Sequence, residues 1–458
     1  MIRKDNFSKI FNQIVIPLTL CTLAFIFYFW LLTKDFLIPG IDGPYYLIQV
    51  EAILERGEMV YGDPPFIFYL AALFATLCGN VRMGVAIAVS LMISLTCFPA
   101  YWLFTRLSKN IFPAIIGSIL LVFSPQMVRL SGDLMKNAAG VFFLILSIYY
   151  VLLASSNWRL KNYIPAILSI FFTFLTHSLD AALSLFFAIT CLIGVVIYYG
   201  RESKIHLRNL FAVISSAALL ILITSIAFPY HFSDVNKGIA FIEDVIFSSP
   251  SNSQLPSVFR PKPARTWPSV SFFEIAYVLP FFIAGFILLI EAYRRKSNDR
   301  FMMLFSAIFM ALLCIFPTIL GLREWAWRFM LMSFIPISFI VGSISLDDNK
   351  VNLIAILIIV ASFILIQTAN ATFLVRPTMS MDTYHDLLEI KEIMTDNASY
   401  RIAYSKGWSR YWPEYLFGRR LEDSKVTYLI IPKDAPPPPP FWRLIYEGKT
   451  LNLYRINK

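Results

Sequence analysis

Long apolar runs separated by short polar segments dominate this chain. About eleven runs approach the roughly 17 to 25 residues that cross a lipid bilayer as a helix. They cover residues 14–32, 82–104, 111–124, 138–154, 163–175, 181–199, 210–229, 272–292, 301–320, 329–346 and 353–375. The pattern predicts an all-α polytopic membrane domain over residues 1–375.

A shorter apolar run at 64–79 begins with two prolines, and we interpret it as a juxtamembrane or re-entrant helix. If this run does not cross, the basic segments around Arg3, Arg106, Arg159, Arg201 and Arg294 all fall on one side of the membrane. Positively charged loops favour the cytoplasmic side. We therefore expect a cytoplasmic N-terminus and an extracytoplasmic C-terminal domain in a multi-pass cell-membrane protein.

Composition supports this class. Of the 458 residues, 58% are hydrophobic and 15% charged, and the mean hydropathy is +0.66. A soluble globular protein could not cover such a composition with a polar surface. The 42 Phe, 22 Tyr and 9 Trp suit lipid-facing and interfacial positions, so membrane lipids are expected partners and nucleic acid is not. All five cysteines lie in apolar segments without metal-binding spacing.

The segment 38–66 is polar and acidic between apolar neighbours. Residues 34–63 contain six acidic and two basic residues, in a protein whose formal net charge is +10. Apolar residues at helical spacing from Tyr46 to Leu54 predict an amphipathic helix on the membrane face, with Asp42 at its entrance. The outer segment 230–271 is rich in proline and serine, as mobile loops are.

Residues 376–458 predict a small extracytoplasmic α/β domain. The pattern indicates a helix at 382–395, strands at 401–405, 426–432, 443–446 and 451–456, and a hairpin turn at 447–449. Residues 436–440 are five consecutive prolines, which predict a stiff connector. Asn397 begins a glycosylation pattern that is common by chance.

Two acids flank the first outer segment. Asp42 could deprotonate an acceptor hydroxyl or bind a metal, or it could simply cap the helix that follows. Asp63 is a candidate substrate-binding residue, but an acid before Pro64 is also typical of a helix cap. The sequence leaves both alternatives open.

Three further outer segments carry candidate residues. Asp133 could be a second acid of the site, or a helix cap paired with Lys136. His177 is a candidate substrate-binding residue, although it could instead satisfy Asp180, three positions later. Arg323 and Arg328 suit a bidentate grip on a phosphate, or anchoring beside interfacial tryptophans.

This arrangement resembles the GT-C superfamily of integral-membrane glycosyltransferases. The resemblance rests on the early Asp42, the amphipathic helix, Asp63-Pro64-Pro65, a span ending in Arg106, and Ser124-Pro125 followed by Asp133. The superfamily includes protein O-mannosyltransferases, lipid A aminoarabinose transferases and the catalytic subunits of oligosaccharyltransferases. The similarity is best over residues 14–180.

The resemblance implies inverting transfer of a sugar from a polyprenyl-phosphate donor to a hydroxyl of a protein, lipid or glycan on the extracytoplasmic face. It implies that Asp42 is the base, Asp133 a second acid, and Arg323 or Arg328 the group that stabilises the departing phosphate. The sequence lacks the Asp-Glu pair of the mannosyltransferases, because Gly43 follows Asp42. The subfamily therefore stays open.

Two other functions compete with transfer. A transporter or flippase of a lipid-linked saccharide would place ionisable residues near the membrane midplane, whereas these spans are almost free of charge. A non-catalytic scaffold would make Asp42 dispensable. No residue set indicates a resident cofactor, and a divalent metal is the one ion that the carboxylates could bind.

Overall fold

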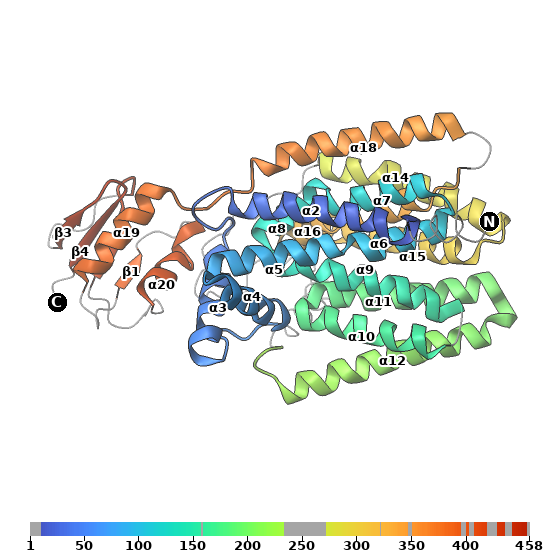
Figure 1. Cartoon of the computed structure of the whole chain (residues 1–458), viewed down its shortest axis with the longest axis horizontal. Helices are drawn as coiled ribbons and strands as arrows, with labels where there is room; N and C mark the ends of the chain where they lie inside the picture. Colours follow the sequence, from blue (N-terminus) through green and yellow to red (C-terminus); the bar gives the residue numbers. More distant parts are fainter. Residues whose placement is uncertain are drawn as a thin grey trace.

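The structure, a computed structural model, describes residues 11–156, 159–232, 272–320, 322–346, 350–394, 400–402, 407–418, 428–435 and 442–455. A bundle of long helices carries a small α/β domain at one end (Figure 1). This architecture confirms the predicted fold class, a helical polytopic membrane protein with a small C-terminal α/β domain.

Every predicted apolar run lies on a helix or on two consecutive helices. The helices that carry the predicted runs are α2 (Ile16–Thr33, preceded by the π-helical turn η1, Phe11–Val15), α5 (Val81–Leu95), α6 (Cys97–Ser108), α7 (Ile111–Val122), α9 (Met135–Ser156), α10 (Leu160–Thr176), α11 (Ser178–Tyr199), α12 (Lys204–Ala227), α14 (Phe272–Arg294), α15 (Asn298–Ile319), α16 (Arg323–Leu331), α17 (Phe334–Gly342) and α18 (Lys350–Thr372). The other helices of this part of the chain are α3 (Gly43–Arg56), α4 (Phe66–Cys78) and α8 (Pro125–Asp133).

Among the described residues, eight helical stretches are long and apolar enough to cross a membrane. One of them, Ser178–Ala227, contains two helices, α11 and α12, joined by the 3-10 turn η2 (Gly200–Ser203). The count of about eleven crossings stays a prediction. The apolar helix α4 is shorter than these stretches and lies beside α3, at the end of the bundle nearest the α/β domain (Figure 1).

Two predicted spans are interrupted in the structure. The run 82–104 divides at Thr96, and the run 329–346 divides at Met332 and Ser333. Proline has no N–H to bond the carbonyl four residues earlier. Pro99 stands three residues after Thr96, and Pro336 stands three residues after Ser333. The missing N–H of each proline explains why the helix breaks at these positions.

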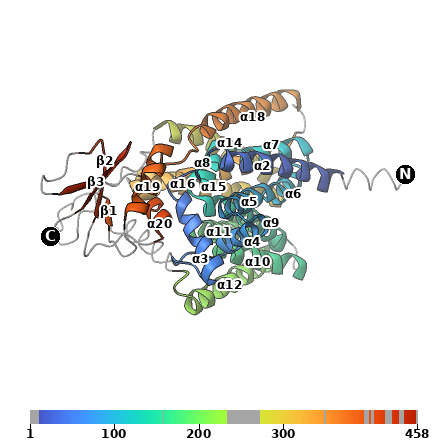
Figure 2. The same ribbon diagram turned by 60° about the vertical axis from the view of Figure 1, so that its left-hand side comes forward.

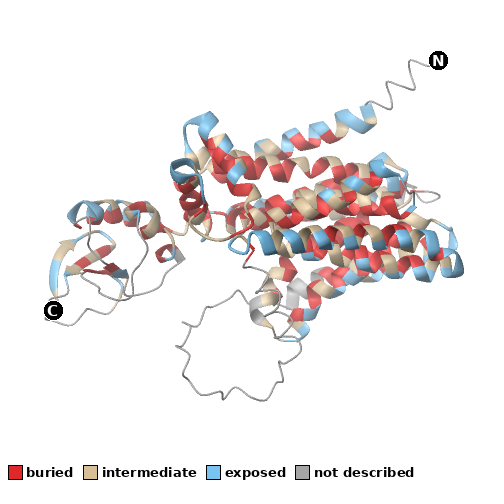
Figure 3. Ribbon diagram, turned by 90° about the horizontal axis from the view of Figure 1, so that it is seen from below, coloured by how far each residue is buried: buried red, intermediate tan, exposed pale blue. Residues whose placement is uncertain are grey.

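The peripheral helices expose apolar side chains on their outer faces. Phe211 is 67% exposed, Ile226 71% and Ile359 67%. Buried positions concentrate inside the bundle, with exposed ones along its outside (Figure 3). Apolar surface of this extent would be unstable in water, so these faces of α12 and α18 suit lipid.

The α/β domain and the start of α2 lie at opposite ends of the bundle (Figures 1 and 2). Near the start of α2, the indole N–H of Trp102 donates to the carbonyl of Gln13 at 3.0 Å. One helical turn farther along α6, Arg106 pairs with Asp299 at 2.6 Å. At least this basic segment therefore lies at the end of the bundle remote from the α/β domain.

The C-terminal elements follow the sequence prediction. Helix α19 covers Met381–Ile393, and the strands are β1 (Tyr400–Ile402), β2 (Tyr428–Pro432), β3 (Arg443–Glu447) and β4 (Leu451–Arg455). The sheet order is β1-β2-β4-β3, with β1 parallel to β2 and the other pairs antiparallel. The structure adds η3 (Gly407–Ser409) and α20 (Trp412–Phe417).

Three sequence predictions fall outside the described residues. They are the proline connector 436–440, the glycosylation pattern at Asn397 and all but the first residues of the loop 230–271. The predicted domain boundary after residue 375 lies between α18 and α19.

A buried carboxylate holds the α/β domain together. Asp386 on α19 accepts hydrogen bonds from the backbone N–H groups of Lys449, Thr450 and Leu451, at 2.9, 2.6 and 2.9 Å. The hydroxyl of Tyr446 also donates to it at 3.1 Å. Burial alone would raise the pKa of Asp386, but these hydrogen bonds outweigh it and hold the pKa below its ordinary value.

We predict that Asp386→Ala destabilises this domain by about 3 kcal/mol, because three backbone donors lose their acceptor. The matched control is Asp382→Ala, whose exposed carboxylate pairs with Lys449 at 3.0 Å and should contribute under about 1 kcal/mol. Hydrogen exchange of the β3 and β4 amides in the full chain measures both. Since the folded-state pKa is lowered, the stabilisation by Asp386 is complete above about pH 4 and is lost as the pH falls further. Equal protection in the two variants would contradict this role.

Candidate active site

Two glycines bring three distant segments together at the end of the bundle nearest the α/β domain. Gly40 has φ +81°, and a Cβ at this position would lie 2.0 Å from the carbonyl oxygen of Gly132. The N–H of Gly40 donates to the carbonyl of Arg376 at 3.2 Å. This close approach joins the first outer segment, the end of α8 and the chain entering the C-terminal domain. Asp42 and Asp133 follow the two glycines within two residues.

Asp42 occupies the N-cap position of α3, but its side chain makes no capping hydrogen bond. The alternative that it is an ordinary helix cap is therefore wrong. Its carboxylate is 29% exposed and lies 3.7 Å from Nη1 of Arg410. Burial raises the pKa of Asp42, while the charges of Arg410, Lys136 and Arg328 oppose the rise. A carboxyl with a raised pKa is a stronger base once it is ionised.

Asp133 is the last residue of α8 and is half-buried. Burial raises its pKa, Arg129 one turn earlier lowers it, and the negative charge of Asp42 raises it further. The structure thus places the two predicted acids within electrostatic reach of each other. The alternative in which Asp133 pairs with Lys136 is wrong, because Lys136 binds another carboxylate.

That carboxylate belongs to Asp63. Both of its oxygens lie 2.5 Å from Nζ of Lys136, and the hydroxyl of Tyr45 donates to one of them at 2.7 Å. Helix α4 instead has Pro65 at its N-cap position, without a side-chain cap, so the cap alternative for Asp63 is also wrong. Lys136 and Tyr45 occupy both oxygens of Asp63, so this carboxylate positions Lys136. The predicted contact of Asp63 with substrate stays untested.

Lys136 was not among the sequence candidates for the site. It is the second residue of α9, and its backbone N–H donates to the hydroxyl of Tyr46 at 2.8 Å. The pKa of Tyr46 is raised well above its ordinary value, first by burial and then by the charge of Asp42. Tyr46 therefore remains a neutral phenol between α9 and the Asp42 carboxylate.

The C-terminal domain reaches this cluster through α20 and the residues before it. The ring of Tyr411 lies 5.2 Å from that of Tyr45. The hydroxyl of Tyr61 donates to the carboxylate of Glu414. Gln49, fully buried in α3, bonds both Tyr45 and the backbone of Tyr61. An aromatic and polar interface thus fixes α20 against α3.

His177 and Asp180 do contact each other, as their spacing predicts. Nδ1 of His177 lies 3.2 Å from Oδ2 of the fully buried Asp180. A Cβ on Gly140 of α9 would meet that oxygen at 2.1 Å, so the pair packs on the helix backbone. Gly140 stands one turn after Lys136, on the same face of α9. The contact fits the structural reading of the pair, and substrate binding by His177 stays a prediction.

Only one of the two predicted arginines can be placed. Arg328 is half-buried, its guanidinium lies 5.7 Å from the ring of Trp327, and its charge acts on Asp42. The side chain of Arg323, at the start of α16, lies outside the described residues. Of the two arginines, Arg328 is therefore the one whose charge is seen to act on Asp42.

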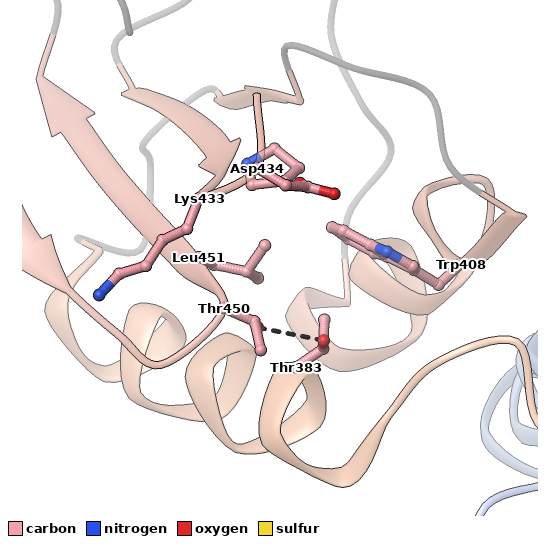
Figure 4. Close-up of a pocket in the computed structure, with 7 residues that line it drawn as sticks. Thr383, Trp408, Lys433, Asp434, Thr450 and Leu451 are labelled. Carbon is pink, nitrogen blue, oxygen red and sulfur yellow. Dashed lines mark hydrogen bonds between the residues drawn. The ribbon is translucent and has the colours of Figure 1, made fainter. Parts of the chain in front are cut away.

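A hollow of about 290 Å³ lies elsewhere, within the C-terminal domain. Trp408 and Asp434 face into it, and Thr450 and Thr383 are hydrogen-bonded at its base, at 3.1 Å (Figure 4). Its lining includes none of the carboxylates of the membrane domain. The chemistry described above therefore belongs to the domain junction, and this hollow is separate from it.

Across the described residues, no group of three or more His, Cys, Asp or Glu side chains could hold a metal ion. Asp42 and Asp133 form only a pair of acids. Metal dependence stays a prediction.

We predict that Gly40→Ala destabilises the junction more than Gly57→Ala. Both glycines have φ near +80°, which costs alanine about 1 kcal/mol, but a Cβ at Gly57 meets no atom within 4 Å. At Gly40 the clash with a backbone carbonyl adds about 1 to 3 kcal/mol. Thermal unfolding in lipid measures the difference, and faster hydrogen exchange at residues 375–379 should accompany Gly40→Ala alone. Indistinguishable variants would show that the close approach is unimportant.

The comparisons with known proteins address the same region. Residues 62–228 match the family model described as dolichyl-phosphate-mannose-protein mannosyltransferase. The match covers Asp63, Asp133, Lys136 and His177, and it excludes Asp42 and the C-terminal domain. No curated protein sequence matches the chain.

One similar solved structure is that of ArnT from Cupriavidus metallidurans bound to undecaprenyl phosphate. The two chains share 11% identity with a TM-score of 0.44, over 97% of this chain and 98% of that one. The family match agrees with the resemblance that the sequence shows. Over residues 62–228 the chain is thus similar to the family described as dolichyl-phosphate-mannose-protein mannosyltransferase.

Proposed function

We propose that this protein transfers a sugar from a polyprenyl phosphate donor of the dolichyl type to an acceptor hydroxyl of a protein, lipid or glycan. Transfer takes place on the extracytoplasmic face, with inversion at the anomeric carbon. The observation that carries the proposal is the position of Asp42, a carboxylate within reach of the charges of Lys136 and Arg328, at one end of an apolar bundle.

The reaction needs a base on one side of the anomeric carbon and cations on the other. Asp42 takes the proton of the acceptor hydroxyl as its oxygen forms the new bond to carbon. The bond from carbon to the phosphate oxygen breaks, and the polyprenyl phosphate leaves with the electron pair. Lys136 and Arg328 stabilise the charge that develops on this phosphate. A single displacement of this kind inverts the configuration.

Burial makes these charges effective. Ion pairs and hydrogen bonds act more strongly where protein excludes water, and groups held in advance need no reorganisation during the reaction. Asp63, which accepts a hydrogen bond from Tyr45, holds Lys136, and the packing of Gly40 on Gly132 holds the backbone beside Asp42 and Asp133. The exposed apolar faces of the bundle suit the polyprenyl chain of the donor.

The extracytoplasmic assignment is supported by charge. Arg106 lies near the start of α2, at the end opposite to Asp42 and the α/β domain. Cytoplasmic loops carry more lysine and arginine than outer ones. The proposed orientation puts the N-terminus in the cytoplasm and the candidate active site outside.

The test is transfer of labelled sugar by the purified protein in lipid, from a panel of dolichyl and undecaprenyl phosphate sugars. We predict that Asp42→Asn lowers kcat by about 10² to 10⁴, because the amide cannot accept the proton. Asp133→Asn should have a smaller effect, and the surface control Asp382→Asn none. Undiminished transfer by Asp42→Asn would remove Asp42 as the base. Absence of transfer by the wild type with every donor would favour the flippase alternative.

A further inference from the structure

The membrane domain does not complete the surroundings of Asp42 by itself. Segment 410–415 of the C-terminal domain lies against α3, which begins directly after Asp42. Tyr61 donates to Glu414, and the hydroxyl of Tyr415 is hydrogen-bonded to Glu51 of α3. These contacts dock α20 against α3 and the segment that follows it, so the residue preceding Tyr411 is held close to Asp42.

That residue is Arg410. Its guanidinium carbon lies 4.6 Å from the ring centre of Tyr411, and its Nη1 lies 3.7 Å from Oδ1 of Asp42. The Tyr411 ring in turn packs against both Tyr45 and Tyr61, with ring centres 5.2 and 6.2 Å away. Stacking on a fixed aromatic ring restricts an arginine whose side chain is otherwise 48% exposed. The cation is therefore aimed at one carboxylate oxygen.

The carboxylate of Asp42 has few other restraints. Within the described part of the chain it accepts no hydrogen bond, and Arg410 is its one ion-pair partner within 4 Å. Lys136 from α9 and Arg328 from α16 act on it from farther away, and Asp63 opposes them. Asp133 from α8, Tyr46 from α3 and Tyr411 also face it. A contact on Oδ1 alone leaves Oδ2 for an acceptor hydroxyl.

We infer that Arg410 is a positioning residue for Asp42, so that the C-terminal domain supplies part of the active site. The inference rests on the proposed function, because it assigns Asp42 the role of base. Arg410 orients the carboxylate and keeps it ionised, which ties the competence of the base to the docking of the domain. An acceptor or donor that displaced α20 would therefore switch off transfer.

The experiment compares Arg410→Ala, Arg410→Lys and the control Arg443→Ala, an exposed arginine on β3 of the same domain. We expect Arg410→Ala to lower kcat by about ten- to a hundredfold near neutral pH, with the donor KM within about twofold of wild type. The acid limb of the pH profile should move to higher pH, because burial then raises the pKa of Asp42 without its nearest cation. Arg410→Lys should restore part of the rate and of the profile, and Arg443→Ala should match wild type.

An unchanged pH profile for Arg410→Ala overturns the inference. A raised donor KM with unchanged kcat also overturns it, because Arg410 would then bind the donor. Hydrogen exchange of α3 and α20 shows whether each variant keeps the domain docked, and an undocked Arg410→Ala is replaced by Arg410→Gln.

A second measurement does not depend on transfer. Carbodiimide couples an amine to the protonated form of a carboxyl, so the labelling of Asp42 as a function of pH, followed by mass spectrometry, reports its ionisation. Arg410→Ala should move the midpoint upward by about one pH unit, equivalent to a tenfold change in ionisation. A midpoint equal to that of wild type overturns the inference even if no donor proves active, whereas failure of transfer alone counts against the proposed function.

Discussion

The contact between the backbones of Gly40 and Gly132 is the constraint on which the site depends. It brings the segment 38–66 against the end of α8, and the N–H of Gly40 donates to the carbonyl of Arg376 at the entry to the C-terminal domain. No side chain fits between them. Since Asp42 and Asp133 follow these glycines within two residues, the separation of the two acids is set by backbone packing and not by flexible side chains.

The second constraint is the cost of burying charge. Carboxylates and cations that leave water without partners destabilise a protein by several kcal/mol, so they must be paired. The carboxylates of the cluster differ in how closely they are paired. Asp63 and Lys136 bind each other closely, and Tyr45 fills the remaining position on Asp63. Asp42 is left with one longer contact to Arg410 and a raised pKa. Asp42 therefore keeps an oxygen that can accept a proton, which the closely paired Asp63 does not.

The helix bundle and the α/β domain contribute different residues to the candidate site. The bundle exposes apolar faces that suit lipid, and it carries Lys136 on α9 and Arg328 on α16. The α/β domain, stabilised by Asp386, presents Arg410 and Tyr411 on a docked segment. The domain lies at the end of the bundle where Asp42 is found, so its docked segment covers part of that carboxylate's surroundings.

The sequence by itself determined the helical bundle and the order of elements in the C-terminal domain, and it predicted that the candidate acids lie on one face of the membrane. These features depend on local patterns, such as apolar runs of spanning length, alternation in short strands and turn residues. The predicted spans 82–104 and 329–346 show the limit of this reasoning. Each is divided near a proline into two helices, so the predicted helix ends are wrong although the helical class is right.

Only the tertiary structure decided which charges are partners. The sequence left open whether Asp133 is a second acid of the site or pairs with Lys136, yet Lys136 binds Asp63, 73 positions away. Tyr61 and Glu414 are separated by 353 positions, and nothing in either neighbourhood predicts their contact. Which charged groups pair depends on which distant segments of the backbone pack together, as at Gly40 and Gly132, and the local pattern of residues does not contain this information. For the same physical reason, the sequence could identify Asp42 as a candidate base but not the arginine beside it.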